Sequence, residues 1–197
     1  MAQKFYAVRK GKKAGIYNSW DECKAQVDGF SGAEYKSFKT KEEALTYMGE
    51  EVCNTKKDPD GVIAYVDGSF NIATKEFSYG MVILRDSKEF TFNKKFYDEE
   101  LSSMRNVAGE IKGAEAAMRY AIDEGLSEIT IYYDYAGIAN WCLGAWKTNK
   151  EGTIAYKAYY DSIKDKVRIY FEKVKGHSGD KYNDMADELA KKALGIL

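Results

Sequence analysis

One short stretch near residue 65 constrains the fold of this chain more than any other. The apolar and aromatic run Val62–Val66 is followed directly by Asp67, Gly68 and Ser69. A run this short and this rich in β-preferring residues is typical of a buried strand in a layered α/β core, not of a helix. We therefore expect Asp67 at the carboxyl end of a core strand, where an unpaired carboxylate is costly. The stretch predicts that Asp67 has partners elsewhere in the chain.

Three other acids are candidates for those partners. The run Ile129–Tyr133 ends at Asp134 in the same way, while Glu110 and Asp187 fall in segments with helical periodicity that should pack against the same sheet. Each acid also has an ordinary explanation: a helix N-cap for Asp134, a tight turn for Asp67, and a surface charge for the other two. As a set, four carboxylates at one end of a core would repel one another unless cations neutralised them.

The type of ligand atom predicts which cation these acids would bind. Oxygen ligands alone suit Mg²⁺ or Mn²⁺ and not zinc. Two such ions, about 4 Å apart, can activate water and stabilise the leaving oxygen in phosphodiester hydrolysis. The acids are therefore candidates for a metal-dependent nuclease site. The single histidine, His177, is by itself more often a loop residue than a catalyst.

The chain divides into two units by its patterns. Residues 1–50 predict a compact α+β unit, whose two helices begin at the capping pairs Ser19–Glu22 and Thr40–Glu43. Residues 51–60 are polar, hold the only proline and predict a linker. Residues 61–197 predict an α/β domain, a mixed five-stranded sheet flanked by helices. Its strands are expected at 62–67, 78–85, 89–97, 127–133 and 167–174, and its helices at 105–124, after 134, at 153–163 and at the C-terminal end.

Composition narrows the class of protein. A hydrophobic content of 45% and a charged content of 31% are ordinary for a soluble globular chain. No apolar run approaches the roughly 20 residues that span a bilayer, and residues 1–6 lack the apolar stretch of a secretory signal. The cysteines, Cys23, Cys53 and Cys142, have no metal-site spacing and suit a reducing compartment. We therefore expect a cytoplasmic protein without a membrane partner; the net charge of −1 decides nothing about nucleic acid.

Aromatic and basic residues alternate through the first unit. Rings beside cations suit a nucleic-acid backbone, although in so small a domain most single rings belong to the core. The segments Phe5–Gly11, Gly15–Tyr17 and Trp20–Val27 resemble the N-terminal hybrid-binding domain of the ribonuclease H1 family, a domain also similar to the viroplasmin-like module. The resemblance implies that this unit grips an RNA/DNA hybrid from the minor groove.

The same resemblance implies which residues make the contacts. The backbone of residues 29–33 would meet the 2′-hydroxyl groups that mark RNA. Many family members have a second lysine where this chain has Ser37, so we expect a weaker grip. The side chains expected to face the DNA strand are Tyr6, Trp20, Tyr35 and Lys36.

The second unit resembles the catalytic domain of type 1 ribonuclease H. The likeness covers residues 62–197 in the right order, and the motifs that carry it are Tyr65–Ser69, Arg105–Glu110, Tyr133–Asp134, Val174–Gly179 and Ala186–Ala190. It implies an endonuclease that hydrolyses the RNA strand of RNA/DNA hybrids and leaves 3′-hydroxyl and 5′-phosphate ends. It also implies two Mg²⁺ ions as cofactors, with Mn²⁺ as a substitute.

By that likeness, residues of three kinds form the site. His177 lies in a loop that assists proton transfer or product release. The substrate contacts are Gly68, Ser69 and Asn106, the last on the side of the RNA 2′-hydroxyl. The metal-binding carboxylates are Asp67, Glu110, Asp134 and Asp187.

The chain departs from the family pattern in three places. The turn at residues 70–75 lacks the usual glycines and prolines, and only Asn106 remains of an Asn-Asn-Arg sequence before the glutamate. A basic protrusion is not evident between Trp146 and Ala155. We therefore expect the N-terminal domain to supply the missing affinity for hybrid.

Two other functions stay open. A relative with the same fold, such as an integrase or junction resolvase, would use similar acids on DNA alone. A non-catalytic protein that binds RNA/DNA hybrid is the second alternative, but the presence of all four carboxylates disfavours it. The expected partner is the RNA/DNA hybrid, bound by a monomer.

Overall fold

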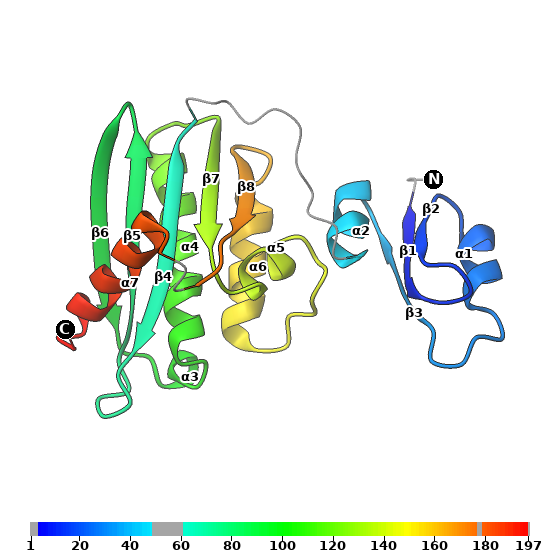
Figure 1. Ribbon diagram of the computed structural model, residues 1–197, viewed down its shortest axis with the longest axis horizontal. Coiled ribbons are helices and arrows are strands. Elements are labelled where there is room, and N and C mark those ends of the chain that lie inside the picture. The colour runs from blue at the N-terminus through cyan, green and yellow to red at the C-terminus, as the bar shows by residue number, and fades with distance from the viewer. Residues whose placement is uncertain (1–3, 49–60, 177–178, 197) are drawn as a thin grey trace. The chain divides into compact units, whose positions relative to one another are not determined.

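A computed structural model describes residues 4–48, 61–176 and 179–196 of the chain (Figure 1). The predicted linker at 51–60 lies outside the described residues. The described strands form two separate sheets, one in each of two compact units.

The small unit is a three-stranded antiparallel sheet with the strand order β2-β1-β3 and two helices. Both helices begin at their predicted caps, because Ser19 Oγ accepts a hydrogen bond from the backbone of Glu22 (3.3 Å) and Thr40 Oγ1 from that of Glu43 (3.2 Å). The predicted α+β unit is confirmed. Its elements are β1 (Phe5–Lys10), β2 (Gly15–Tyr17), α1 (Trp20–Val27), β3 (Glu34–Phe38) and α2 (Lys41–Met48).

The large unit contains a five-stranded sheet with the order β6-β5-β4-β7-β8 (Figure 1). The first three strands form an antiparallel meander, whereas β4, β7 and β8 run parallel to one another. The mixed sheet predicted from the sequence is confirmed. Its strands are β4 (Ile63–Phe70), β5 (Phe77–Arg85), β6 (Lys88–Phe96), β7 (Glu128–Tyr133) and β8 (Arg168–Lys173).

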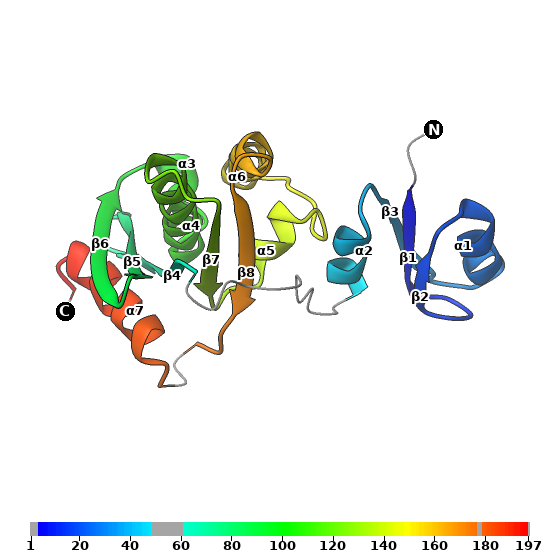
Figure 2. The ribbon, with the colours of Figure 1, turned by 90° about the horizontal axis from the view of Figure 1, so that it is seen from above.

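Helices cover both faces of this sheet, as Figure 2 shows, with α4 on one face and α7 on the other. α4 also packs against α6, which in turn contacts α5. The short helix α3 was not predicted; Asp98 caps it by accepting from the backbone of Leu101 at 2.9 Å. The helices are α3 (Glu99–Ser102), α4 (Asn106–Asp123), α5 (Gly137–Cys142), α6 (Glu151–Ile163) and α7 (Lys181–Ala193).

The strand that carries Asp67 does not end there. β4 continues to Phe70, and Asp67 pairs with Gly80 of β5. The predicted strand end was wrong, because the antiparallel partner extends β4 beyond the point where its parallel partner stops. Pairing of β4 with β7 ends at Tyr65 and Tyr132. Asp67 therefore lies inside a strand but just past the end of its parallel ladder.

Two features bear on the class of protein. Cys23 and Cys142 are buried free thiols, as expected for packing residues, while Cys53 lies outside the described residues. Across the helices of the described ranges, none combines the length and the hydropathy that a bilayer crossing requires.

Candidate active site

The parallel register of β4 and β7 brings two acids together. Tyr65 pairs with Tyr132, and two residues further along each strand stand Asp67 and Asp134. Asp67 stands within β4, whereas Asp134 is the first residue after the end of β7. The two acids therefore lie just beyond the end of the parallel ladder.

Glu110 reaches these acids because α4 lies very close to β4. A Cβ atom at Gly68 would lie 2.4 Å from the backbone nitrogen of Glu110, and one at Gly109 would lie 2.0 Å from the carbonyl oxygen of Ser78. Only glycine at both positions permits this approach. Glu110 is 2% exposed, so its interpretation as a surface charge was wrong.

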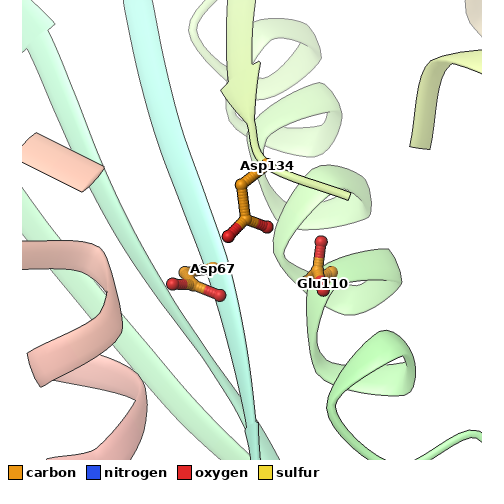
Figure 3. A group of neighbouring side chains, drawn as sticks. All are labelled: Asp67, Glu110 and Asp134. Carbon is orange, nitrogen blue, oxygen red and sulfur yellow. The ribbon is translucent and has the colours of Figure 1, made fainter. Parts of the chain in front are cut away.

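The three acids form a compact cluster (Figure 3). Asp67 from β4, Glu110 from α4 and Asp134 after β7 each offer an oxygen atom, and these atoms lie within 4.8 Å of one another. Glu110 Oε2 is buried and has no hydrogen-bond partner among the described residues. A buried acceptor without a partner is costly, and a cation would supply the partner. The donor set, which consists only of carboxylate oxygens, fits Mg²⁺.

Burial and mutual repulsion oppose ionisation of two of these acids. Burial, followed by the neighbouring charge of Asp134, raises the pKa of Asp67 to about 7. Burial likewise raises the pKa of Glu110 to about 9, with Asp134 and Asp67 as the charged neighbours. A divalent cation would reverse both effects, because it favours the ionised carboxylates.

Asp187 lies beside this cluster but is not a member of the 4.8 Å group. It belongs to α7, which passes so close to β5 that a Cβ atom at Gly80 would lie 2.0 Å from the carbonyl oxygen of Ala186. Gly80 is the cross-strand partner of Asp67, so the residue after Ala186 flanks that acid. The charge of Asp187 adds to the raised pKa of Asp67, after burial and Asp134.

The cation that Asp187 contacts was missed by the sequence reasoning. Lys191 Nζ donates to Asp187 Oδ2 at 2.5 Å, one helical turn further along α7. The signal was present in the sequence, because an acid and a base four residues apart on a helix are neighbours.

Asp134 is flanked by a glycine and does not cap a helix. α5 begins only at Gly137, so the interpretation of Asp134 as its N-cap was wrong. A Cβ atom at Gly176 would lie 2.5 Å from Asp134 Oδ2, which means that the chain after β8 passes in contact with the carboxylate. The next residue, His177, lies outside the described residues, and its role stays a prediction.

The predicted substrate contacts in the large unit differ in exposure. Ser69 is buried, and Gly68 is covered by the first turn of α4. Asn106 is exposed as the first residue of α4, with its backbone oxygen next to Gly68. Of the three, Asn106 has the side chain that is free to meet a substrate beside the acids.

Three aromatic rings line one face of the small unit. The ring centroids of Tyr6 and Trp20 are 5.8 Å apart, and those of Trp20 and Tyr35 are 5.9 Å apart. Trp20 is 43% exposed and Tyr35 45%, so the interpretation of these two rings as core residues was wrong. The rings form a continuous surface, the ring surface, that is open to solvent.

Lys36 does not belong to the ring surface. In the sheet Tyr6 pairs with Ser37 and Ala7 with Lys36, and neighbouring residues of a strand point to opposite faces. Lys36 Nζ lies 5.4 Å from the ring of Phe38, a residue of the core beneath α2. The contact of Lys36 with nucleic acid stays a prediction. Ser37, the cross-strand partner of Tyr6, lies on the same face of the sheet as the ring surface.

Comparisons with known proteins match both units. A family model described as "Ribonuclease H1 N-terminal domain" matches residues 4–48, and one described as "RNase H" matches residues 59–195. The chain is 26% identical to Ribonuclease H1 of Homo sapiens over 255 residues, which cover 95% of this chain and 88% of that protein. It is 59% identical to a Ribonuclease H of Saccharomyces cerevisiae over 46 residues, which cover 23% of this chain but only 13% of the length of that protein.

A solved structure shares the fold of the large unit. The crystal structure of RNase H1 from Halobacterium salinarum NRC-1 superposes with a TM-score of 0.57 and 21% sequence identity. The superposition covers 69% of this chain and 98% of the archaeal chain. The five-stranded sheet with helices on both faces is therefore an RNase H-like fold.

Proposed function

We propose, because the chain belongs to the ribonuclease H family, that it is an endonuclease that hydrolyses the RNA strand of RNA/DNA hybrids. The family match extends over residues 59–195, which include every acid of the site. The observation that carries the chemistry is the cluster of Asp67, Glu110 and Asp134, whose oxygen atoms lie within 4.8 Å of one another. Packing holds these acids together in spite of their repulsion, as expected for a site built to hold cations.

The proposed cofactor is a pair of Mg²⁺ ions, for which Mn²⁺ would substitute. When bound, the ions would activate water and stabilise the leaving oxygen, which would leave 3′-hydroxyl and 5′-phosphate ends. Asp67, Glu110 and Asp134 would hold them, with Asp187 as the fourth ligand from α7. The three acids come from three elements in tight contact, so packing and not side-chain freedom sets their positions. Glu110 Oε2, which is buried without a hydrogen-bond partner among the described residues, supports this assignment.

Two residues next to the acids receive proposed roles. His177 follows Gly176, which lies against Asp134, so we assign it to proton transfer or product release. Asn106 is exposed beside Gly68 and would contact the RNA strand near its 2′-hydroxyl. Gly68 and Ser69 would contact the substrate through their backbone, since a buried side chain and a glycine offer little else.

The proposed grip on the hybrid lies in residues 1–50, joined by a linker at 51–60 to a catalytic domain at 61–197. The ring surface of Tyr6, Trp20 and Tyr35 would pack on sugars and bases of the DNA strand, with Lys36 nearby on a phosphate. The loop at 29–33 contains two glycines in the left-handed region, Gly29 (φ 71°) and Gly32 (φ 73°), which leave its backbone open toward 2′-hydroxyl groups. A monomer in the cytoplasm stays the expectation for the whole protein.

One gel tests the proposal against both alternatives. Labelled RNA/DNA, RNA/RNA and DNA/DNA duplexes are incubated with the protein with and without Mg²⁺. We expect cleavage of the RNA strand of the hybrid alone, and only with Mg²⁺. Cleavage of DNA/DNA would instead favour a DNA nuclease with the same fold, and binding of hybrid without cleavage would favour the non-catalytic alternative. Asp67→Asn is the inactive reference, and Asp123→Asn, an exposed acid at the end of α4, is the matched control.

A further inference from the structure

We propose that Lys191 is a positioning residue that acts as a built-in counter-ion of the acid site, so that a divalent cation engages Asp187 only by displacing the Lys191 ammonium. This inference rests on the proposed function, because it concerns the same site. It assigns a role to a residue outside the ligand set: Lys191 sets the affinity of the site for divalent cations.

The geometry of α7 is the first support. Lys191 Nζ lies 2.5 Å from Asp187 Oδ2, and the spacing of four residues places both side chains on one face of the helix. The helix itself is held in place, because Ser78 Oγ donates to the carbonyl oxygen of Ala190 at 2.6 Å and the carbonyl of Ala186 lies against Gly80. Asp187 therefore joins the other acids by side-chain rotation and not by movement of α7, and the side chain that restrains this rotation is Lys191.

The distribution of charge is the second support. Among the described residues, Asp67, Glu110 and Asp134 form a group within 4.8 Å and make no ion pair, whereas Asp187 stands outside the group and is ion-paired. In the metal-free protein, Lys191 thus supplies part of the positive charge that the acids need.

The position of Lys191 lets it leave at low cost. The side chain of Lys191 is 37% exposed, against 19% for that of Asp187. Its ammonium can therefore rotate out into the solvent when a divalent cation binds. A partly exposed ion pair of this kind contributes little free energy. Lys191 therefore lowers the affinity for a divalent cation in two ways: it competes for Asp187, and it repels the incoming charge.

The test measures binding of Mn²⁺ to the intact protein without nucleic acid, by titration calorimetry. Lys191→Met removes the charge and keeps the length of the side chain, and Lys191→Arg keeps the charge. Lys192→Met is the matched control, since Lys192 is the next residue of α7 and is exposed. We expect the Kd of Lys191→Met to be roughly 3- to 10-fold lower than that of the wild type, as for the removal of one nearby positive charge. Lys191→Arg and Lys192→Met should match the wild type.

The result separates a charge effect from damage to the fold. A purely structural role would weaken binding in Lys191→Met, because a disturbed helix misplaces Asp187; tighter binding supports only the counter-ion role. A Kd for Mn²⁺ that is unchanged or higher in Lys191→Met overturns the inference. If Asp67→Asn still abolishes Mn²⁺ binding in that case, the proposed function stays in place. If no variant shows Mn²⁺ binding that depends on Asp67, the proposed function fails and the inference fails with it.

Discussion

The ring surface of the small unit and the acid cluster of the large unit are opposite in construction. Trp20 and Tyr35 are nearly half exposed and lie 15 positions apart in the sequence, on a helix and a strand. Asp67 and Glu110 are 7% and 2% exposed and come from a strand and a helix 43 positions apart. A surface proposed to bind nucleic acid has to be open to it, whereas a site proposed to hold cations is expected to exclude competing water.

This difference teaches where stability and function conflict. The rings pack against one another in water and cost the fold little, so the small unit can change them without unfolding. The acids repel one another inside a packed core, and two of them have strongly raised pKa values. The large unit therefore gives up stability for its site, as functional sites often do. Four substitutions, from the largest expected effect to the smallest, test this contrast.

Removal of one acid should separate the two regions most sharply. Asp67→Asn keeps the shape of the side chain but removes a charge that the cations need. We expect cleavage of hybrid to fall roughly 10³-fold or more, as for loss of a central catalytic group, while hybrid binding stays nearly intact. Single-turnover cleavage and a gel shift measure the two quantities. Turnover at the level of the Asp123→Asn control would exclude the assigned role.

A methyl group next to Asp134 should also reach the acids. In Gly176→Ala the new Cβ atom would lie 2.5 Å from Asp134 Oδ2, so the carboxylate or the chain after β8 has to move. We expect cleavage to fall roughly 10- to 100-fold, since small displacements of a catalytic group are costly. The control is Gly15→Ala, where the nearest atom would be 3.5 Å away. Equal activity of both variants would show that the contact with Asp134 does not matter.

Loss of a ring should weaken binding and leave chemistry alone. Trp20→Ala removes the central ring of the ring surface, and stacking on an aromatic side chain contributes about 1–3 kcal/mol per base. We expect the Kd for hybrid to rise roughly 5- to 100-fold with an unchanged cleavage rate at saturation and an unchanged Tm. Tyr97→Ala, which removes a 70% exposed ring of the large unit, is the control. A large fall in Tm for Trp20→Ala would show that this ring stabilises the fold as a core residue does.

The cost of the buried acid should appear as a dependence of stability on pH. Glu110 has an ordinary pKa of 4.5 in the unfolded chain and about 9 in the metal-free fold, so the folded state binds its proton more tightly. The free energy of unfolding therefore falls as the pH rises from 4.5 toward 9. Glu110→Gln cannot ionise at this position, so its free energy of unfolding should not fall in this way. Measured in the presence of a chelator, the Tm of Glu110→Gln should exceed that of the wild type at pH 8 but not at pH 4.

The size of that effect is measured as a change in Tm. A gain of 1 kcal/mol raises the Tm of a chain of this length by roughly 2–4 °C. Differential scanning calorimetry at the two pH values measures it, with Asp123→Asn as the control. A Tm of Glu110→Gln at or below that of the wild type at pH 8 would show that this carboxylate does not burden the fold.

Most elements could be predicted from local patterns, and the errors have specific causes. The strand Gly15–Tyr17 and the caps at Ser19 and Thr40 depend on neighbours in sequence, and they were confirmed. The end of β4 was misplaced, because an antiparallel partner distant in sequence extends it to Phe70. That Lys36 lies on the opposite face of the sheet from Tyr6 could not be predicted, because the resemblance gave a residue list without the register of the strands.

The sequence by itself determined which residues could serve the site: the acids at the ends of apolar runs and in helical segments, and the rings beside cations. Only the tertiary structure decided how they meet. The register of β4 on β7 brings Asp67 level with Asp134, the glycine contact of α4 admits Glu110, and α7 presents Asp187 already paired with Lys191. The physical reason is that local patterns report burial and capping, whereas distances between residues far apart in the chain depend on how whole elements pack.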